Sequence, residues 1–277
     1  MEKKIPLRFF FVTFLWSWGV EIPCVILVKT GIMPEVSPLY SIMQMPIAFL
    51  AIMGPAIGAF VSLYSIEGKG AIKNHLKKFL SLNFGLKVWV SVFLISGIST
   101  FLSWIIPEFF GEAGIPTMLQ NIYLFPLFLL LNSFILGGQE EIGWRGYILP
   151  YLENRFGLIV GSLILGTVWA VWHIPLWFIP GTSQTYMNFF AFLLSSIGVS
   201  YFLSWVKETS GNRLLSCLFA HGTINSFAVL FPVFVTDNDS TQVRFWIFCI
   251  LKFIIGIIIV IERIRNKKEY KTSVNVA

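Results

Sequence analysis

The chain has 277 residues, of which 56% are hydrophobic and only 12% are charged. Soluble domains carry about 25% charged residues, so this composition excludes an ordinary soluble protein and predicts one that exposes apolar side chains to lipid. The net charge of +6 would suit nucleic-acid binding, but the sequence has no basic, aromatic-rich soluble segment. In a membrane protein a basic excess usually sets the topology, so we expect the bilayer and not nucleic acid as the partner.

Eight apolar stretches are long enough to cross a bilayer, since a transmembrane helix needs about 20 such residues. They run over residues 8–28, 40–64, 87–106, 120–138, 158–179, 187–206, 213–235 and 243–261. The first stretch is long and lacks a small-residue cleavage site, so we interpret it as a span and not as a cleaved signal peptide. The sequence therefore predicts an all-α, polytopic membrane protein with about eight transmembrane helices.

Residues 66–85 lie between the second and third predicted spans and mix lysines with apolar side chains. This pattern is typical of an amphipathic helix that lies on the membrane surface.

Basic residues are distributed unevenly between the two sides of the predicted topology. With the N-terminus inside, the outer loops hold only Lys29 and Arg244, and Lys252 falls within the last span, which leaves 17 of the 20 lysines and arginines on the inner side. Because positive charge favours cytoplasmic segments, we expect a multi-pass protein of the cell membrane with both termini in the cytoplasm.

The stretch "GGQEEIGWRG", residues 137–146, follows the fourth predicted span and holds three charges. The two glycines end that span, and we expect a new helix to begin near Gln139. Glu141 and Arg145 are four residues apart, so they share a helix face and can form an ion pair. Glu140 is turned by about 100° and projects elsewhere. The alternative interpretation is an ion pair that reaches for water at the end of a span.

Two of the three histidines lie inside predicted spans, and each has a partner four residues away. Trp169 precedes His173 in the fifth span, and Asn225 follows His221 in the seventh. Ionisable groups inside a span are costly, so each is a candidate functional residue. The alternative is a histidine that hydrogen-bonds to a neighbouring helix, or a His–Asn pair that joins two helices. Glu21, in the first span, has no charged partner at helical spacing and stays unassigned.

These side chains together fit a hydrolytic set. A glutamate can take a proton from water, and a histidine can hold that water or pass the proton to a leaving amine. A second histidine and an asparagine can donate hydrogen bonds to a developing oxyanion. The two aspartates, Asp237 and Asp239, lie in one outer loop, which excludes a paired-aspartate intramembrane protease, and the G-x-S-x-G and H-E-x-x-H motifs are absent. A zinc site of two histidines and one carboxylate stays open.

Three motifs, "EEIGWRG", "WAVWHIPLW" and "HGTIN", resemble those of the CPBP family, also called Abi, which takes in CAAX prenyl endopeptidases and bacteriocin-processing proteins. The resemblance covers residues 120–230. Trp169 stands where the family usually has phenylalanine, an aromatic exchange that should keep the packing.

The resemblance implies a glutamate-dependent intramembrane endopeptidase that needs no metal. It implies that Glu140 and His173 activate water and that His221 and Asn225 form the oxyanion site. Glu141, Arg145 and Trp169 would support this site.

We expect three regions: N-terminal transmembrane helices and the amphipathic segment over 1–119, the catalytic core over 120–230, and the last span with a basic tail over 231–277. The expected function is cleavage of a peptide or membrane-protein substrate near the cytoplasmic face, in peptide maturation or bacteriocin self-immunity. The alternatives are a non-catalytic immunity or binding protein of the same fold and a transporter. The transporter is disfavoured because the sequence shows no internal repeat.

The depth of the two histidines in the membrane is a test of this interpretation. His173 lies sixteen residues beyond Gly157, about 24 Å of helix, whereas His221 lies about 12 Å beyond Arg213. The two rings reach the same depth only if Gly157 lies outside the hydrocarbon layer.

Overall fold

The computed structural model describes residues 5–81, 83–237 and 240–276, which are built from helices and connecting segments without a strand. The α-helices are α1 (Leu7–Lys29), α2 (Pro38–Ile52), α3 (Gly54–Glu67), α4 (Lys69–Lys77), α5 (Leu86–Ile105), α6 (Phe125–Phe134), α7 (Glu141–Gly143), α8 (Leu149–Trp172), α9 (Phe189–Thr209), α10 (Leu215–Leu230) and α11 (Val243–Val276). The predicted all-α polytopic fold is confirmed.

Six helical stretches of the described residues are long and apolar enough to cross a membrane. One of them, Leu119–Phe178, is 60 residues long and contains both the fourth and the fifth predicted spans. The seventh predicted span corresponds to α10, which is apolar but shorter than the others. Each of the predicted stretches therefore coincides with a helix, and the second is divided into α2 and α3 at Met53.

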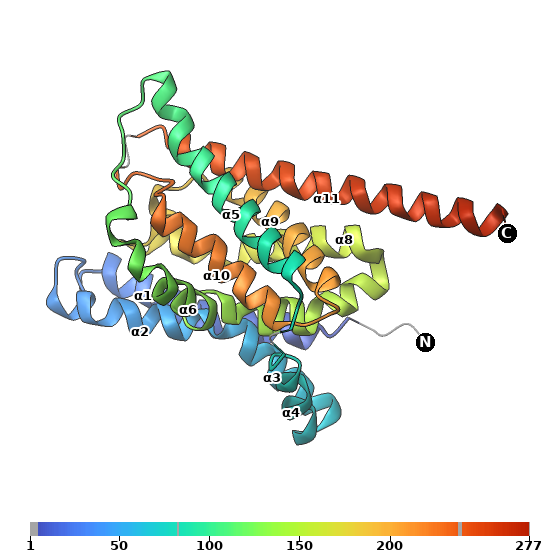
Figure 1. Ribbon diagram of the computed structural model, residues 1–277. Coiled ribbons are helices and arrows are strands. Elements are labelled where there is room, and N and C mark those ends of the chain that lie inside the picture. Colours follow the sequence, from blue (N-terminus) through green and yellow to red (C-terminus); the bar gives the residue numbers. More distant parts are fainter. Residues whose placement is uncertain (1–4, 82, 238–239, 277) are drawn as a thin grey trace.

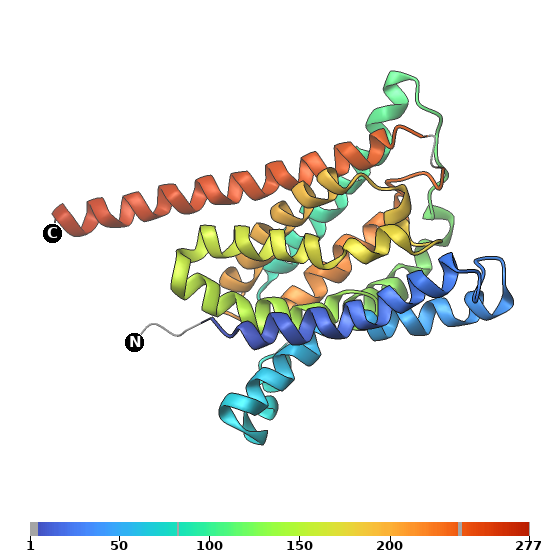
Figure 2. The ribbon, with the colours of Figure 1, turned by 180° about the vertical axis from the view of Figure 1, so that it is seen from behind.

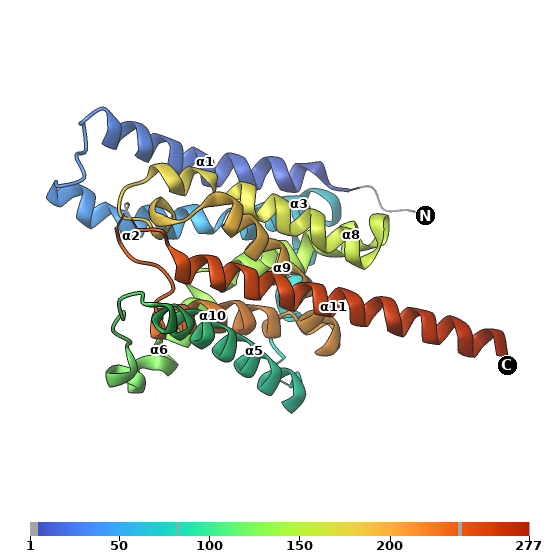
Figure 3. The same ribbon diagram turned by 90° about the horizontal axis from the view of Figure 1, so that it is seen from above.

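The helices form a bundle with α8, α9 and α10 in its middle, α1 along one edge and α5 along the opposite edge (Figure 3). The N-terminal end of α1 and the C-terminal end of α11 lie at the same end of the bundle, where α11 runs past the other helices (Figures 1 and 2). This agrees with an even number of crossings.

The helix that carries His173 begins at a backbone break. Gly157 has φ +78° and ψ 165° inside α8, which no helical residue adopts, so the chain turns there and a fresh helix runs to Trp172. His173 caps that helix, and Pro175 follows within a short 3₁₀ helix, Ile174–Phe178. Because proline lacks a backbone donor, the α-helix ends where the histidine begins.

The predicted surface helix is shorter than expected. It covers Lys69–Lys77 only, because residue 67 still belongs to α3 and Gly68, at φ +79°, separates the two helices. Helix α4 and the end of α3 that leads to it project from the bundle (Figure 1). Helix α4 is amphipathic, with Ala71 and His75 buried. Burial lowers the pKa of the His75 imidazole below its ordinary value, and Nε2 lies 2.9 Å from the backbone oxygen of Ile142, to which the neutral ring donates.

The charge distribution predicts the orientation of this bundle, which cysteine labelling tests. The native cysteines Cys24, Cys217 and Cys249 are buried, so they should give little background. We expect a Glu112→Cys variant to react with a membrane-impermeant maleimide in intact cells, because Glu112 is exposed in a predicted outer loop. Lys77→Cys, on exposed α4, should react only after the membrane is opened. Labelling in the reverse order would contradict the topology.

Candidate active site

The charged motif begins in an irregular helical segment. A 3₁₀ turn, Gly138–Glu140, passes into α7 and then into a π-helix, Trp144–Ile148. π-Helical turns are uncommon and frequently occur at functional sites. Helix α3 lies close against this segment, because a side chain at Gly143 would meet the backbone oxygen of Pro55 at 2.2 Å. The glycine therefore permits the close approach of two backbones that holds the motif in place.

Glu141 contacts two basic side chains in the interior. Its Oε1 accepts a hydrogen bond from Arg145 Nη1 at 2.9 Å and lies 2.9 Å from His221 Nδ1, and its side chain is fully buried. The ion pair that the four-residue spacing predicts is present. The bond to His221 links the first motif to the third across 80 residues of chain.

Arg145 is fully buried, and its guanidinium lies over the ring of Trp169, 5.2 Å from the centroid. Arginine over a tryptophan face is a favourable cation–π arrangement. Arg145 thus contacts the first motif through Glu141 and the second motif through Trp169.

Glu140 points away from that pair, as the helical phase predicts, and its Oε2 accepts a hydrogen bond from Trp169 Nε1 at 2.8 Å. Glu140 is 3% exposed. The sequence interpretation gave Trp169 a packing role only. Its indole N–H orients the carboxylate, which a phenylalanine cannot do, so the exchange from the usual residue was itself a signal of this bond.

His173 is held through its Nδ1, which lies 2.7 Å from the backbone oxygen of Trp169. A carbonyl only accepts, so Nδ1 carries the proton and Nε2 of the neutral ring keeps its lone pair. The ring packs edge-on against Trp172 and Phe192. His173 can therefore accept a proton or hold a water molecule at Nε2.

His221 and Asn225 lie on one face of α10 and meet the segment before the glutamates. A side chain at Gly137 would lie 3.2 Å from His221 Nε2 and 2.8 Å from Asn225 Nδ2, so these two nitrogens converge on one small space. Asn225 Nδ2 also donates a long hydrogen bond, 3.4 Å, to the backbone oxygen of Leu136.

One cavity of about 640 Å³ connects these groups, and its lining is mostly apolar. It is lined by Glu140, Trp169, His173, His221 and Asn225, together with side chains of α9, α10 and α11. The ring centroid of Trp169 lies 5.5 Å from that of His173 and 5.4 Å from that of His221. The two histidines therefore share one site. The position of Gly157 outside the hydrocarbon layer stays a prediction.

Comparison with known proteins agrees with this geometry. Residues 122–227, which contain all three motifs, match the family model described as "Type II CAAX prenyl endopeptidase Rce1-like". This match and the three motifs together support the CPBP family. The chain is 25% identical over 236 residues to CAAX prenyl protease 2 of Methanococcus maripaludis, an alignment that covers 80% of this chain and 83% of that protein.

Glu21 lies close enough to this site for its carboxyl group to interact with that of Glu140. It is 3% exposed, and its Oε2 has no hydrogen-bond partner. One turn earlier on α1, Trp18 Nε1 donates to the backbone oxygen of Trp172 at 3.0 Å. Sequence reasoning left Glu21 unassigned because its neighbour comes from a distant segment.

The donor set does not form a recognisable metal centre. Among the described residues, no group of three or more histidine, cysteine, aspartate or glutamate side chains is arranged to hold a metal ion. The Nδ1 atoms of both site histidines already have partners, in Trp169 O and Glu141 Oε1.

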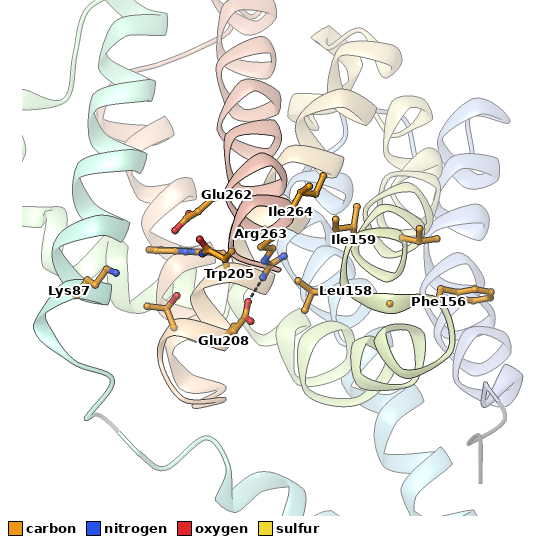
Figure 4. A pocket seen from close by; sticks show the side chains of 13 residues that line it. Lys87, Phe156, Leu158, Ile159, Trp205, Glu208, Glu262, Arg263 and Ile264 are labelled. Carbon is orange, nitrogen blue, oxygen red and sulfur yellow. Dashed lines mark hydrogen bonds and ion pairs between the residues drawn. The ribbon is translucent and has the colours of Figure 1, made fainter. Parts of the chain in front are cut away.

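A second hollow, of about 740 Å³, lies where α5, α8, α9 and α11 meet. Figure 4 shows Lys87, Trp205 and Glu262 around it, with an ion pair between Arg263 and Glu208 at 2.8 Å. None of the motif residues lines this hollow. The candidate chemistry therefore belongs to the smaller, more apolar cavity.

The bridging role of Glu141 predicts a large loss of stability on Glu141→Gln. Removing one member of a buried pair leaves an uncompensated charge, so we expect thermal or denaturant unfolding in detergent to show a loss of about 3–5 kcal/mol. Glu208→Gln is the matched control, because Glu208 pairs with Arg263 but its side chain is 59% exposed, and exposed pairs contribute about 1 kcal/mol or less. Equal losses in both variants would contradict the bridging role.

Proposed function

We propose that this protein is an intramembrane endopeptidase that hydrolyses a peptide bond near the cytoplasmic face of the membrane. The observation that carries the proposal is the placement of Glu140, His173, His221 and Asn225 around one apolar cavity. The family match supports the same activity.

In the proposed reaction, Glu140 and His173 activate a water molecule. Trp169 donates a hydrogen bond to one oxygen of the Glu140 carboxylate, and the other oxygen takes a proton from water. The lone pair of His173 Nε2 accepts the second hydrogen of that water and fixes its direction. Water oxygen then bonds to the carbonyl carbon as its proton passes to Glu140.

The carbonyl oxygen becomes an oxyanion as the new bond forms, and His221 and Asn225 would stabilise it. Asn225 Nδ2 is a donor in every state. His221 donates its Nδ1–H to Glu141, so it offers a second N–H from Nε2 only as the imidazolium, whose charge the Glu141 carboxylate compensates. Donors that are held in place before the reaction are most effective in a site that excludes water.

The tetrahedral intermediate collapses when the amide nitrogen leaves. The proton taken from water returns from Glu140 to that nitrogen, the carbon–nitrogen bond breaks, and the products are a carboxylic acid and an amine. Glu140 ends in the ionisation state in which it began, so the cycle needs no further reactant.

The apolar cavity lining suits an apolar segment of a peptide or of a membrane protein. The relative from M. maripaludis is named a CAAX prenyl protease, so a prenylated C-terminus is one candidate of this class. The physiological role we propose is peptide maturation or bacteriocin self-immunity. The second candidate function is non-catalytic binding of a peptide in the same cavity.

Replacement of Glu140 separates catalysis from binding. We expect Glu140→Gln to lower the cleavage rate of fluorescence-quenched apolar peptides by about 10²–10⁴-fold in liposomes, because the variant cannot accept the proton of water. Glu112→Gln, which changes an exposed glutamate away from the cavity, should retain the wild-type rate. Peptide profiling of cells that carry either variant would identify natural products of cleavage. Unchanged processing or immunity with Glu140→Gln would favour the binding function.

We also propose that the reaction needs no metal ion, since a carboxylate and an imidazole together can activate the water. Treatment of the purified protein with EDTA or 1,10-phenanthroline should leave the cleavage rate unchanged. Loss of activity that zinc restores would show that the two histidines and Glu140 bind a catalytic metal instead.

A further inference from the structure

Gly137 occupies a position that only glycine adopts easily. Its φ is +134°, and the space where a side chain would begin is the point toward which His221 Nε2 and Asn225 Nδ2 converge. The 2.8 Å approach to Asn225 Nδ2 is shorter than real side-chain contacts, so even a methyl group at this position would displace the amide. The glycine therefore keeps open the space that the two donors face.

Gln139 fixes the backbone on which this space depends. Its Oε1 accepts the backbone N–H of Gly137 at 2.9 Å, and its Nε2 donates to the backbone oxygen of Ile135 at 2.7 Å. Gln139 is only 4% exposed. One buried amide thus binds a donor and an acceptor of the segment that precedes it.

Contacts on the other side of the segment hold it against two helices. A side chain at Gly138 would meet the backbone oxygen of Ser133 at 2.2 Å and that of Leu218 at 2.8 Å, so the backbone lies tightly between the end of α6 and α10. The carbonyl of Leu136 accepts from the Asn225 amide. A shift of residues 135–138 would therefore move the amide that faces the open space.

We propose that residues 135–139 form one wall of the oxyanion site, that the oxyanion occupies the space beside Gly137, and that Gln139 is a positioning residue for this wall. The inference rests on the proposed endopeptidase function and extends its site to residues outside the three motifs. Gln139 acts through Gly137 and Asn225 and does not itself touch the substrate.

Loss of such positioning should affect the transition state more than substrate binding. Displacement by about 1 Å in a preorganised site costs on the order of 10²-fold in rate, and loss of one oxyanion donor costs about 10²–10³-fold. Because the oxyanion exists only after water has attacked, kcat should fall while KM changes little.

The decisive variant is Gln139→Met, which keeps the length of the side chain and removes both hydrogen bonds. We expect kcat for the fluorescence-quenched peptides to fall by about 10–100-fold, with KM within about twofold. Binding of a phosphinic peptide, a tetrahedral mimic, should weaken in proportion to kcat/KM. Gln44→Met is the matched control, because Gln44 also donates to one loop carbonyl, that of Pro180, but does not line the cavity.

Gly137→Ala provides a second test, which fills the open space directly. We expect a fall in kcat of about 10²-fold or more, from loss of the Asn225 donor. Gly157→Ala controls for backbone strain, since Gly157 also has positive φ but has open space around it. Thermal unfolding of each variant shows whether the fold is retained. If Gly137→Ala does not fold, the kinetics of Gln139→Met alone test the proposal.

The outcomes separate this inference from the proposed function. If Glu140→Gln abolishes cleavage but Gln139→Met keeps wild-type kcat and phosphinic-peptide affinity, the wall proposal is wrong and the endopeptidase stands. A fall in kcat/KM carried by KM alone, with unchanged affinity for the phosphinic peptide, would also overturn it. If the wild-type protein cleaves no peptide, the proposed function itself fails, and if Glu140→Gln leaves cleavage intact, the proposed role of Glu140 fails.

Discussion

The buried carboxylate of Glu141 is the interaction on which the site depends. In an apolar interior an ionised group is costly unless charged and hydrogen-bonding partners compensate it. Arg145 supplies the opposite charge and His221 supplies a further hydrogen bond, both to the same oxygen. The three side chains therefore hold α7, the π-helix and α10 together, and Trp169 extends the arrangement to α8 through its contact with Arg145.

That arrangement leaves the reactive atoms facing the cavity. Trp169 binds one oxygen of Glu140, and its backbone carbonyl accepts a hydrogen bond from Nδ1 of His173. A single residue thus orients both groups that we propose to act on water. On the opposite side, Glu141 orients the ring of His221 through its contact with Nδ1. The adjacent glutamates have different partners, because the helical turn directs one into the cavity and the other into the protein.

Local patterns predicted the parts of the site that depend on helical spacing. The Glu141–Arg145 pair and the separate direction of Glu140 follow from residues four and one apart on a helix. The Glu141–His221 bond, the nearness of Glu21 to Glu140 and the convergence of two side chains on Gly137 join segments that meet only in the fold. Helical periodicity carries no information on such contacts. The tryptophan in the second motif and the two glycines before the first motif were the visible signs that segments meet there.

Composition also does not show where individual helices begin and end. Hydropathy located the apolar helices, because apolar side chains must cover the length of a helix in lipid. The end of α3 and the start of α4 depend on one glycine with positive φ, which a composition average over residues 66–85 does not resolve. The break at Gly157 is of the same kind, and it sets where the helix carrying His173 begins.

The most direct test of the account is an experimental structure with a phosphinic peptide bound. The account predicts the phosphorus within the cavity of Glu140, with one phosphinyl oxygen at hydrogen-bond distance from Glu140 and the other beside Gly137, facing His221 and Asn225. A peptide bound in the hollow between α5 and α11, or one whose phosphinyl group lies away from Glu140, would contradict it.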